Sequence, residues 1–177
     1  MPLAMNPAMN RGPYNVLFLC TANSARSILA EAILNKLAGG RFRAFSAGSQ
    51  PRGEVHPMAI KLLQTQGIDS SFARSKAWDE FTGENEPQMD FIFTVCDSAA
   101  GEACPIWPGK PITAHWGVPD PAAAEGSETD RYLAFVQTWR LLAHRIELFL
   151  SLPIDRIDRL TLSSRLGEIG QATNREN

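Results

Sequence analysis

Short apolar runs separated by polar loops set the pattern of this chain. Residues 14–19, 43–47, 91–95 and 111–115 each combine apolar and β-prone residues over a few positions. Runs of this kind are typical of buried strands, so we predict a strand in each of them.

Apolar residues at helical spacing occupy most of the remaining chain. They predict helices over residues 27–37, 57–66, 128–150 and 153–169. Ser127 and Asp130 match a capping box at the start of the third helix, and Gly67 ends the second. Strands that alternate with helices predict an α/β fold, a three-layer sandwich around a parallel sheet.

One domain is expected over residues 14–170. Residues 1–13 hold three Pro, one Gly and two Asn but no apolar run of signal-peptide length, which predicts a disordered tail. The polar residues 171–177 are expected to fray.

Composition excludes two classes of function. The 177 residues are 44% hydrophobic and 20% charged, with a formal net charge of −2, and no basic stripe points to nucleic acid. The longest apolar stretch, residues 135–150, contains Arg140, His144, Arg145 and Glu147, so it cannot span a membrane. We therefore expect a cytoplasmic protein.

The three cysteines are Cys20, Cys96 and Cys104. An odd number without an export signal argues against a structural disulfide framework. Reduced thiols in the cytosol are instead catalytic, redox-active or simply buried.

Three polar segments directly follow predicted strands, namely residues 20–27, 96–104 and 115–121. In parallel sheets, ligands bind beyond the carboxyl ends of the strands. These segments should therefore meet at one edge of the sheet and form a site there.

The first of these segments has the composition of an anion-binding loop. It consists of Cys20, Thr21, Ala22, Asn23, Ser24, Ala25, Arg26 and Ser27. Small residues between a strand and a helix let the backbone amides converge on an anion, and Asn23 tolerates a left-handed conformation. Arg26 offers a planar fork for two oxygens of a tetrahedral anion. The same dipoles lower the pKa of a cysteine at the base, so Cys20 is predicted to be a nucleophilic thiolate, and Ser27 can donate a hydrogen bond to its sulfur.

A cysteine followed six places later by an arginine occurs often by chance, so this spacing alone is weak. The context supports catalysis, because an apolar strand precedes the loop, small residues fill it and a helix follows.

Cys96 and Cys104 permit several interpretations. They can be two partly buried thiols or a resolving pair that passes a disulfide from the core to the surface. A zinc site is disfavoured, because no Cys-x-x-Cys occurs and His115 has no partner nearby in the sequence, so we predict no metal. The spacing leaves the buried and the redox interpretations open.

Asp120 lies between Pro119 and Pro121. A stiff backbone suits a general acid that must be placed accurately, but Asp beside Pro is also a common turn. Composition alone favours the turn, whereas a neighbouring anion loop makes the general acid plausible. No histidine of the chain forms a Ser/His/Asp pattern.

At these residues the sequence resembles the low-molecular-weight phosphatase family. The loop and the Ile28-Leu29-Ala30-Glu31 that follows are similar to its signature, and residues 23–27, 45–48 and 115–121 are similar to its arsenate reductase branch. The resemblance covers about residues 14–150. It implies a four-stranded parallel sheet with helices on both faces, and no cofactor.

The resemblance also implies a mechanism. Cys20 would attack arsenate, held by Arg26 and the loop amides, with phosphate or sulfate as competing anions, and Asp120 would protonate the departing oxygen. Cys96 would attack Cys20 and release arsenite, and Cys104 would then attack Cys96. Thioredoxin or glutaredoxin would reduce the final Cys96–Cys104 disulfide.

The chain departs from the family in two places. Seven residues separate Cys96 from Cys104, whereas thioredoxin-coupled members have six. Some members bind potassium near the residues that match Asn23, Glu31 and Ser46, completed by an aspartate, and that last position falls near Lys76. The hypothesis is that the Lys76 ammonium replaces the charge of the metal.

Two other functions are alternatives. A protein tyrosine phosphatase needs only Cys20, Arg26 and Asp120. Such phosphatases carry an aromatic pair after the Asp-Pro, but here Ala122, Ala123 and Ala124 follow. A non-catalytic anion sensor would not need a nucleophilic cysteine.

Overall fold

The computed structural model describes residues 12–83, 86–97, 99 and 107–172. Its strands are β1 (Tyr14–Cys20), β2 (Phe42–Gly48), β3 (Phe91–Thr94) and β4 (Ile112–His115). Its helices are α2 (Arg26–Leu37), α3 (Pro57–Thr65), α5 (Glu128–Leu150) and α6 (Arg159–Ile169), with 3₁₀ turns η1 (Ser70–Phe72), η2 (Trp78–Phe81) and η3 (Pro121–Ala123). Residues 1–11 of the predicted tail, residues 173–177 of the predicted fraying end and Cys104 lie outside the described residues.

All four strands are parallel, in the order β2-β1-β3-β4. Their register aligns Leu19 of β1 with Ala47 and Thr94, and Thr94 with His115. The predicted four-stranded parallel sheet is therefore confirmed. The carboxyl ends of the strands lie at one edge, so the segments that follow β1, β3 and β4 share that edge.

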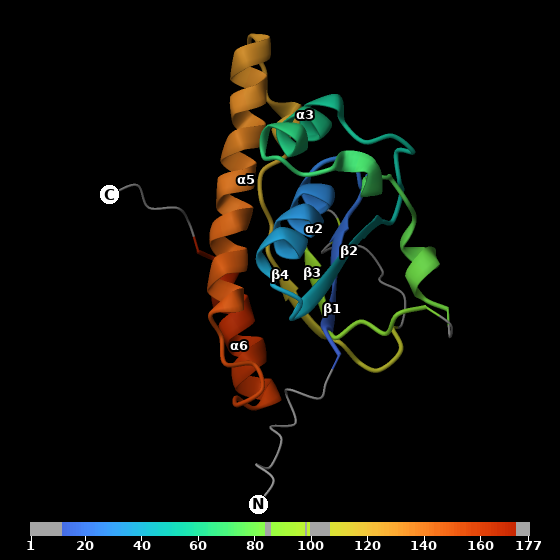
Figure 1. Ribbon diagram of the computed structural model, residues 1–177, viewed down its shortest axis with the longest axis vertical. Coiled ribbons are helices and arrows are strands. Elements are labelled where there is room, and N and C mark those ends of the chain that lie inside the picture. Colours follow the sequence, from blue (N-terminus) through green and yellow to red (C-terminus); the bar gives the residue numbers. More distant parts are fainter. Residues whose placement is uncertain (1–11, 84–85, 98, 100–106, 173–177) are drawn as a thin grey trace, which may run out of the picture.

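The two faces of the sheet are covered differently. One face, with Val16 and Phe18, packs against α2, α3, α5 and α6, and α5 runs beside α2 along the length of the molecule (Figure 1). The other face, with Leu17 and Leu19, packs against Phe81 of the 3₁₀ turn η2, which lies on the side away from α5 (Figure 1). Within the described residues, the regular helices thus lie on the first face and short turns cover the second.

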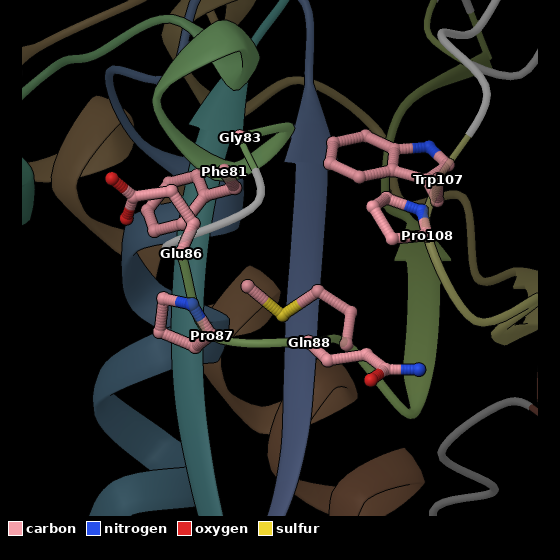
Figure 2. A pocket seen from close by; sticks show the side chains of 8 residues that line it. Phe81, Gly83, Glu86, Pro87, Gln88, Trp107 and Pro108 are labelled. Atoms are coloured by element: carbon pink, nitrogen blue, oxygen red, sulfur yellow. The ribbon is translucent and has the colours of Figure 1, made fainter.

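A pocket opens on this second face. Figure 2 shows Trp107 and Pro108 on one side of it and Phe81 and Pro87 on the other, above the strands. It contains neither the predicted anion loop nor Asp120, so we assign it no part in the chemistry.

The long helix α5 begins as predicted. The Ser127 amide donates to Asp130 Oδ2 (3.2 Å) and the Asp130 amide donates to Ser127 Oγ (3.0 Å), which is a reciprocal capping box. The capping box predicted from the sequence is therefore confirmed, and it sets the start of α5 at Glu128.

The predicted start of the last helix was wrong. The sequence favoured residue 153, but α6 begins at Arg159, because Asp158 Oδ1 accepts the Thr161 amide (2.9 Å) and caps the helix there. Residues 151–157 form turns that bury Ile154.

Aromatic packing ties β4 to the helical layer. The Trp116 ring stacks on Phe93 with the ring centroids 3.9 Å apart, and its indole N–H donates to the Leu166 carbonyl (2.9 Å). This contact anchors the segment that leaves β4 and carries Asp120. In the described part of the chain, none of the helices combines the length and hydrophobicity that a bilayer span requires.

Candidate active site

The loop between β1 and α2 lies at the carboxyl edge of the sheet. Cys20 is the last residue of β1 and is buried, and Arg26 is the first residue of α2. Ala25 precedes the helix and offers no side-chain cap. The amides at this helix start are therefore available to an anion, as the sequence predicted.

The carbonyl groups of the loop point away from its centre. The amides of Gln50, Arg52 and His56 donate to the carbonyls of Thr21 (2.9 Å), Ala22 (2.9 Å) and Ser24 (2.8 Å). Within one peptide unit the N–H points opposite to the C=O. Because residues 50–56 bind these carbonyls from outside, the amides that follow them face the inside of the loop, where an oxyanion would sit.

Asn23 holds the shape of the loop. Its φ of 46° is the left-handed conformation that the sequence predicted it would tolerate. Its side-chain amide donates to Ser27 Oγ (2.7 Å) and Ser46 Oγ (3.1 Å), and its Oδ1 accepts the Lys76 amide (2.9 Å). Ser27 thus contacts Asn23, and the predicted bond from Ser27 to the Cys20 sulfur is not among the contacts recorded for the described residues.

Gly48 allows this loop to pack closely on β2. A Cβ at this position would lie 2.4 Å from the Thr21 carbonyl oxygen and 3.0 Å from the Cys20 carbonyl oxygen. Any larger residue would displace the loop. Gly48 belongs to the segment 45–48 that resembles the arsenate reductase branch, and its role becomes visible only in the fold.

A buried ion pair lies behind Asn23. Ser46 Oγ donates to Glu31 Oε1 (2.5 Å) and accepts the Lys76 ammonium (3.3 Å), which lies 3.9 Å from Glu31 Oε1. The ammonium also donates to the Arg74 carbonyl (3.0 Å). Burial raises the pKa of Glu31, which the Lys76 charge lowers in turn, and burial lowers the pKa of Lys76. The loop is therefore braced by a desolvated pair of charges.

The same cluster bears on the hypothesis that the Lys76 ammonium replaces the charge of a potassium ion. The Lys76 ammonium lies among Ser46, Glu31 and the Arg74 carbonyl, where a monovalent cation would need those oxygens. These residues do not fit a resident potassium ion, because the ammonium already occupies the oxygens that would bind it.

Arg26 connects the loop to Asp120. Its guanidinium donates to the Val118 carbonyl (3.1 Å) and lies 3.9 Å from Asp120 Oδ2. Asp120 Oδ1 accepts the Ala122 amide (3.0 Å) and begins η3, so the turn interpretation is correct for this oxygen. The other oxygen is left at the mouth of the loop, where it can face a bound anion.

Cys96 lies against Cys20. Thr21 Oγ1 is 3.6 Å from Cys96 Sγ, and the Ala99 amide donates to the same sulfur (3.4 Å). A hydrogen bond between the two thiols, together with burial, raises the pKa of Cys20, whereas Arg26 lowers it. The same bond lowers the pKa of Cys96 to about 5. The two thiols therefore lose the first proton easily, and the second proton stays in the hydrogen bond between the two sulfurs. The sequence predicted a thiolate at Cys20 alone, whereas the negative charge belongs to the pair.

Two arginines lie near His56, which borders the loop through its hydrogen bond to the Ser24 carbonyl. Burial lowers the pKa of His56, and the nearby Arg52 and Arg131 lower it further. Both arginines favour the approach of an anion. His56 itself caps α3 by accepting the Met58 amide at Nδ1 (3.1 Å).

Arg145 is a positioning residue that the sequence analysis missed. It stands in the helix α5, where it was taken as a break in an apolar run, but only 4% of it is exposed. Its guanidinium donates to the carbonyls of Trp116 (2.8 Å) and Gly117 (3.0 Å). It thereby fixes the segment between β4 and Asp120, which only the folded chain reveals.

The five predicted catalytic residues divide into two groups. Cys20, Arg26, Cys96 and Asp120 gather at the loop, whereas Cys104 lies outside the described residues. Among the residues that the structure describes, no three His, Cys, Asp or Glu side chains are grouped as a metal site would require.

Comparisons with known proteins show the family of this chain. The sequence model of the family described as low molecular weight phosphotyrosine protein phosphatase matches residues 15–159. The arsenate reductase of Halalkalibacterium halodurans is 36% identical over 134 residues, which are 76% of this chain and 93% of the relative.

Solved structures similar to this chain include further arsenate reductases. An arsenate reductase from Archaeoglobus fulgidus superposes with a TM-score of 0.60 and 26% identity, over 77% of this chain and 99% of that one. A thioredoxin-dependent arsenate reductase from Corynebacterium glutamicum gives a TM-score of 0.53 and 27% identity, over 79% of this chain and 65% of that one.

Proposed function

Because the chain belongs to the low-molecular-weight phosphotyrosine protein phosphatase family, we propose that it uses this family's anion loop to reduce arsenate to arsenite. The contact between Cys20 and Cys96 at the base of the loop carries the proposal. Hydrolysis of a phosphate ester needs one nucleophile, whereas reduction of arsenic needs two electrons, which two thiols supply as they become a disulfide.

Arsenate binds first. Its oxygens receive hydrogen bonds from the inward-facing amides of Ala22, Asn23 and Ala25 and from the Arg26 fork, in the place that phosphate or sulfate would also occupy. The partial positive charge at the start of α2 and the arginines at the rim stabilise the bound anion.

Cys20 then attacks the arsenic. Its proton passes along the hydrogen bond to Cys96, whose thiolate is the adjacent base. A sulfur–arsenic bond forms and an arsenic–oxygen bond breaks, and Asp120 donates a proton to the departing oxygen, which leaves as water. Arg26 keeps Asp120 beside that oxygen.

The second thiol completes the reduction. Cys96 gives its proton to an oxygen of the arsenic group and attacks Cys20 Sγ, a disulfide forms, and the electron pair of the sulfur–arsenic bond stays on arsenic. One arsenate and two thiols therefore give one arsenite, one disulfide and one water. The Thr21 hydroxyl and the Ala99 amide support this step because they stabilise the Cys96 thiolate.

Recycling is assigned to Cys104. Its thiol would attack Cys96, free Cys20 and leave a Cys96–Cys104 disulfide for thioredoxin or glutaredoxin to reduce. The relative from Corynebacterium glutamicum is named thioredoxin-dependent, which supports this class of reductant. A cytoplasmic location follows from the proposal, since those reductants keep thiols reduced there.

Protein tyrosine phosphatase activity is the second candidate. Cys20, Arg26 and Asp120 meet its needs, and the matched family carries that name. The rim argues against it as the main activity, because Ala122 and Ala123 are exposed after Pro121 where an aromatic ring would hold the substrate.

A parallel assay of arsenate reduction and aryl-phosphate hydrolysis tests the proposal. Cys96→Ser should stop arsenate turnover but spare the hydrolysis of aryl phosphate, because the hydrogen bond that raises the pKa of Cys20 is then lost and Arg26 favours the Cys20 thiolate without a separate base. Cys20→Ser should abolish both activities. Arsenate turnover by Cys96→Ser at the wild-type rate would show that the second electron does not come from this thiol.

A further inference from the structure

An exposed hydrogen-bonded chain adjoins Cys96. The His115 ring donates from Nε2 to Asp97 Oδ1 (2.8 Å), and a neutral ring then accepts the Thr94 hydroxyl at Nδ1 (2.7 Å). Thr94 ends β3 and His115 ends β4, so the chain ties Asp97 to the edge of the sheet. The proposed chemistry uses none of these three side chains.

Gly117 leaves the space that this contact occupies. A Cβ at Gly117 would lie 2.6 Å from His115 Nε2 and 2.7 Å from Asp97 Oδ1. Gly117 shows no left-handed backbone, so its lack of a side chain serves this close approach. Arg145 holds the Gly117 carbonyl (3.0 Å), which keeps the backbone from moving aside.

Asp97 directly follows Cys96, so the position of one sets the position of the other. The main chain around them is held by the Trp116 amide, which donates to the Thr94 carbonyl (2.7 Å), and by the Val118 amide, which donates to the Val95 carbonyl (3.0 Å). Beyond Cys96, the Ala99 amide bonds to the sulfur itself. The His115–Asp97 hydrogen bond adds a side-chain contact between the backbone bonds before Cys96 and the Ala99 bond after it.

We propose that the His115–Asp97 pair, in the space left by Gly117, is a latch that positions Cys96 against Cys20. The inference rests on the proposed function, since it gives Cys96 its task. His115 and Asp97 are positioning residues that act through the Cys96 backbone. Misplacing a reacting group by about 1 Å can slow a reaction by up to 10²-fold. The Asp97 side chain is 95% exposed, so the latch favours one position of Cys96 and can still open.

The test uses the Cys104→Ser variant, in which Cys20 and Cys96 are the only thiols left. His115→Ala removes the donor, Gly117→Ala forces the pair apart, and His115→Gln keeps a donor toward Asp97. Asp69→Ala is the control for a lost surface hydrogen bond elsewhere, because it removes an exposed carboxylate that caps η1 by accepting the Ser71 amide (2.9 Å).

The first readout is the rate at which one equivalent of arsenate produces the Cys20–Cys96 disulfide. We expect His115→Ala and Gly117→Ala to lower the maximal rate about threefold to tenfold, the range of one hydrogen bond, at unchanged half-saturating arsenate. His115→Gln should recover most of the rate, and Asp69→Ala should match the parent.

The second readout is the pH profile of iodoacetamide alkylation at Cys96, which does not involve arsenate. The latch variants should shift the midpoint upward relative to the parent, because Cys96 loses part of the contact with Cys20 and Thr21 that lowers its pKa. Parent-like rates and midpoints in both latch variants would overturn the latch, as would equal losses in His115→Gln and His115→Ala. If the parent itself forms no disulfide with arsenate, the proposed function fails, and the alkylation profile still decides the latch.

Discussion

Replacing Lys76 by Met tests whether the anion loop depends on a buried positive charge. The ammonium lies 3.9 Å from Glu31 Oε1, and both residues are 8% exposed. Two charges at this distance interact by about 4 kcal/mol at an effective dielectric constant near 20, and removing one member of a buried pair costs about 3–5 kcal/mol. Glu31 recovers part of this loss by taking up a proton, so we expect a net loss of about 2–4 kcal/mol.

Chemical and thermal unfolding measure this loss. In a chain of this size about 1 kcal/mol corresponds to 2–4 °C, so the melting temperature of Lys76→Met should fall by roughly 4–16 °C. Turnover should fall as well, since Asn23 loses its support through Ser46.

The loss should depend on pH in a defined direction. Burial already raises the pKa of Glu31, and without Lys76 it rises further. A carboxyl whose folded pKa lies above its unfolded value stabilises the fold below the unfolded pKa and loses that contribution as the pH rises through the folded pKa. The deficit of Lys76→Met should therefore be smaller near pH 5 than near pH 8.

Two controls accompany this variant. Adding Glu31→Gln to Lys76→Met should restore much of the stability, because no charge is then left unpaired. Exchange of sodium for potassium should leave wild-type turnover unchanged. A Lys76→Met protein within about 0.5 kcal/mol of wild type near pH 8, or severalfold activation of wild type by potassium, would refute the reasoning.

Three further predictions concern the loop itself. Arg26→Lys should lower arsenate turnover strongly, because an ammonium cannot form the planar fork, and a merely mild change in affinity would argue against a bidentate clamp. Asp120→Asn keeps the oxygen that caps η3, so it should lower turnover by about 10²–10⁴-fold with little change in arsenate binding, whereas an effect on stability alone would leave Asp120 as a turn residue. Iodoacetamide near pH 7 should modify Cys96 faster than Cys20, because the pKa of Cys96 is lowered to about 5 and that of Cys20 is raised; faster labelling of Cys20 would reverse that assignment.

Most of the fold could be predicted from patterns of residues that are close together in the sequence. The strands β1 to β4 and the capping box of Ser127 and Asp130 depend on residues close together in the sequence, and the structure places them where the pattern predicted. The loop from Cys20 to Ser27 is local too, because one short segment contains both the nucleophile and the amides. The start of α6 was predicted wrongly because the apolar pattern extends back to Pro153, whereas the Asp158 side chain caps the helix at Arg159.

Residues that act across the fold were harder to find. Arg145 is a polar residue in an apolar helix, and only the path of the segment after β4 explains its burial. The pairing of His115 with Asp97 joins residues 18 positions apart, so it cannot be seen in the local sequence around His115. The reason for a glycine at position 48 is the close approach of the Cys20 loop to β2, which only the folded chain shows.

The thiol state of the Cys104→Ser protein after one exposure to arsenate, without any reductant, tests the central claim most directly. The account predicts one arsenite per protein molecule and a Cys20–Cys96 disulfide in the mass spectrum of its peptides. Wild-type protein treated in the same way should carry Cys96 linked to Cys104 instead. Arsenite release while Cys20 and Cys96 both remain free thiols, or the absence of arsenite, would contradict the account.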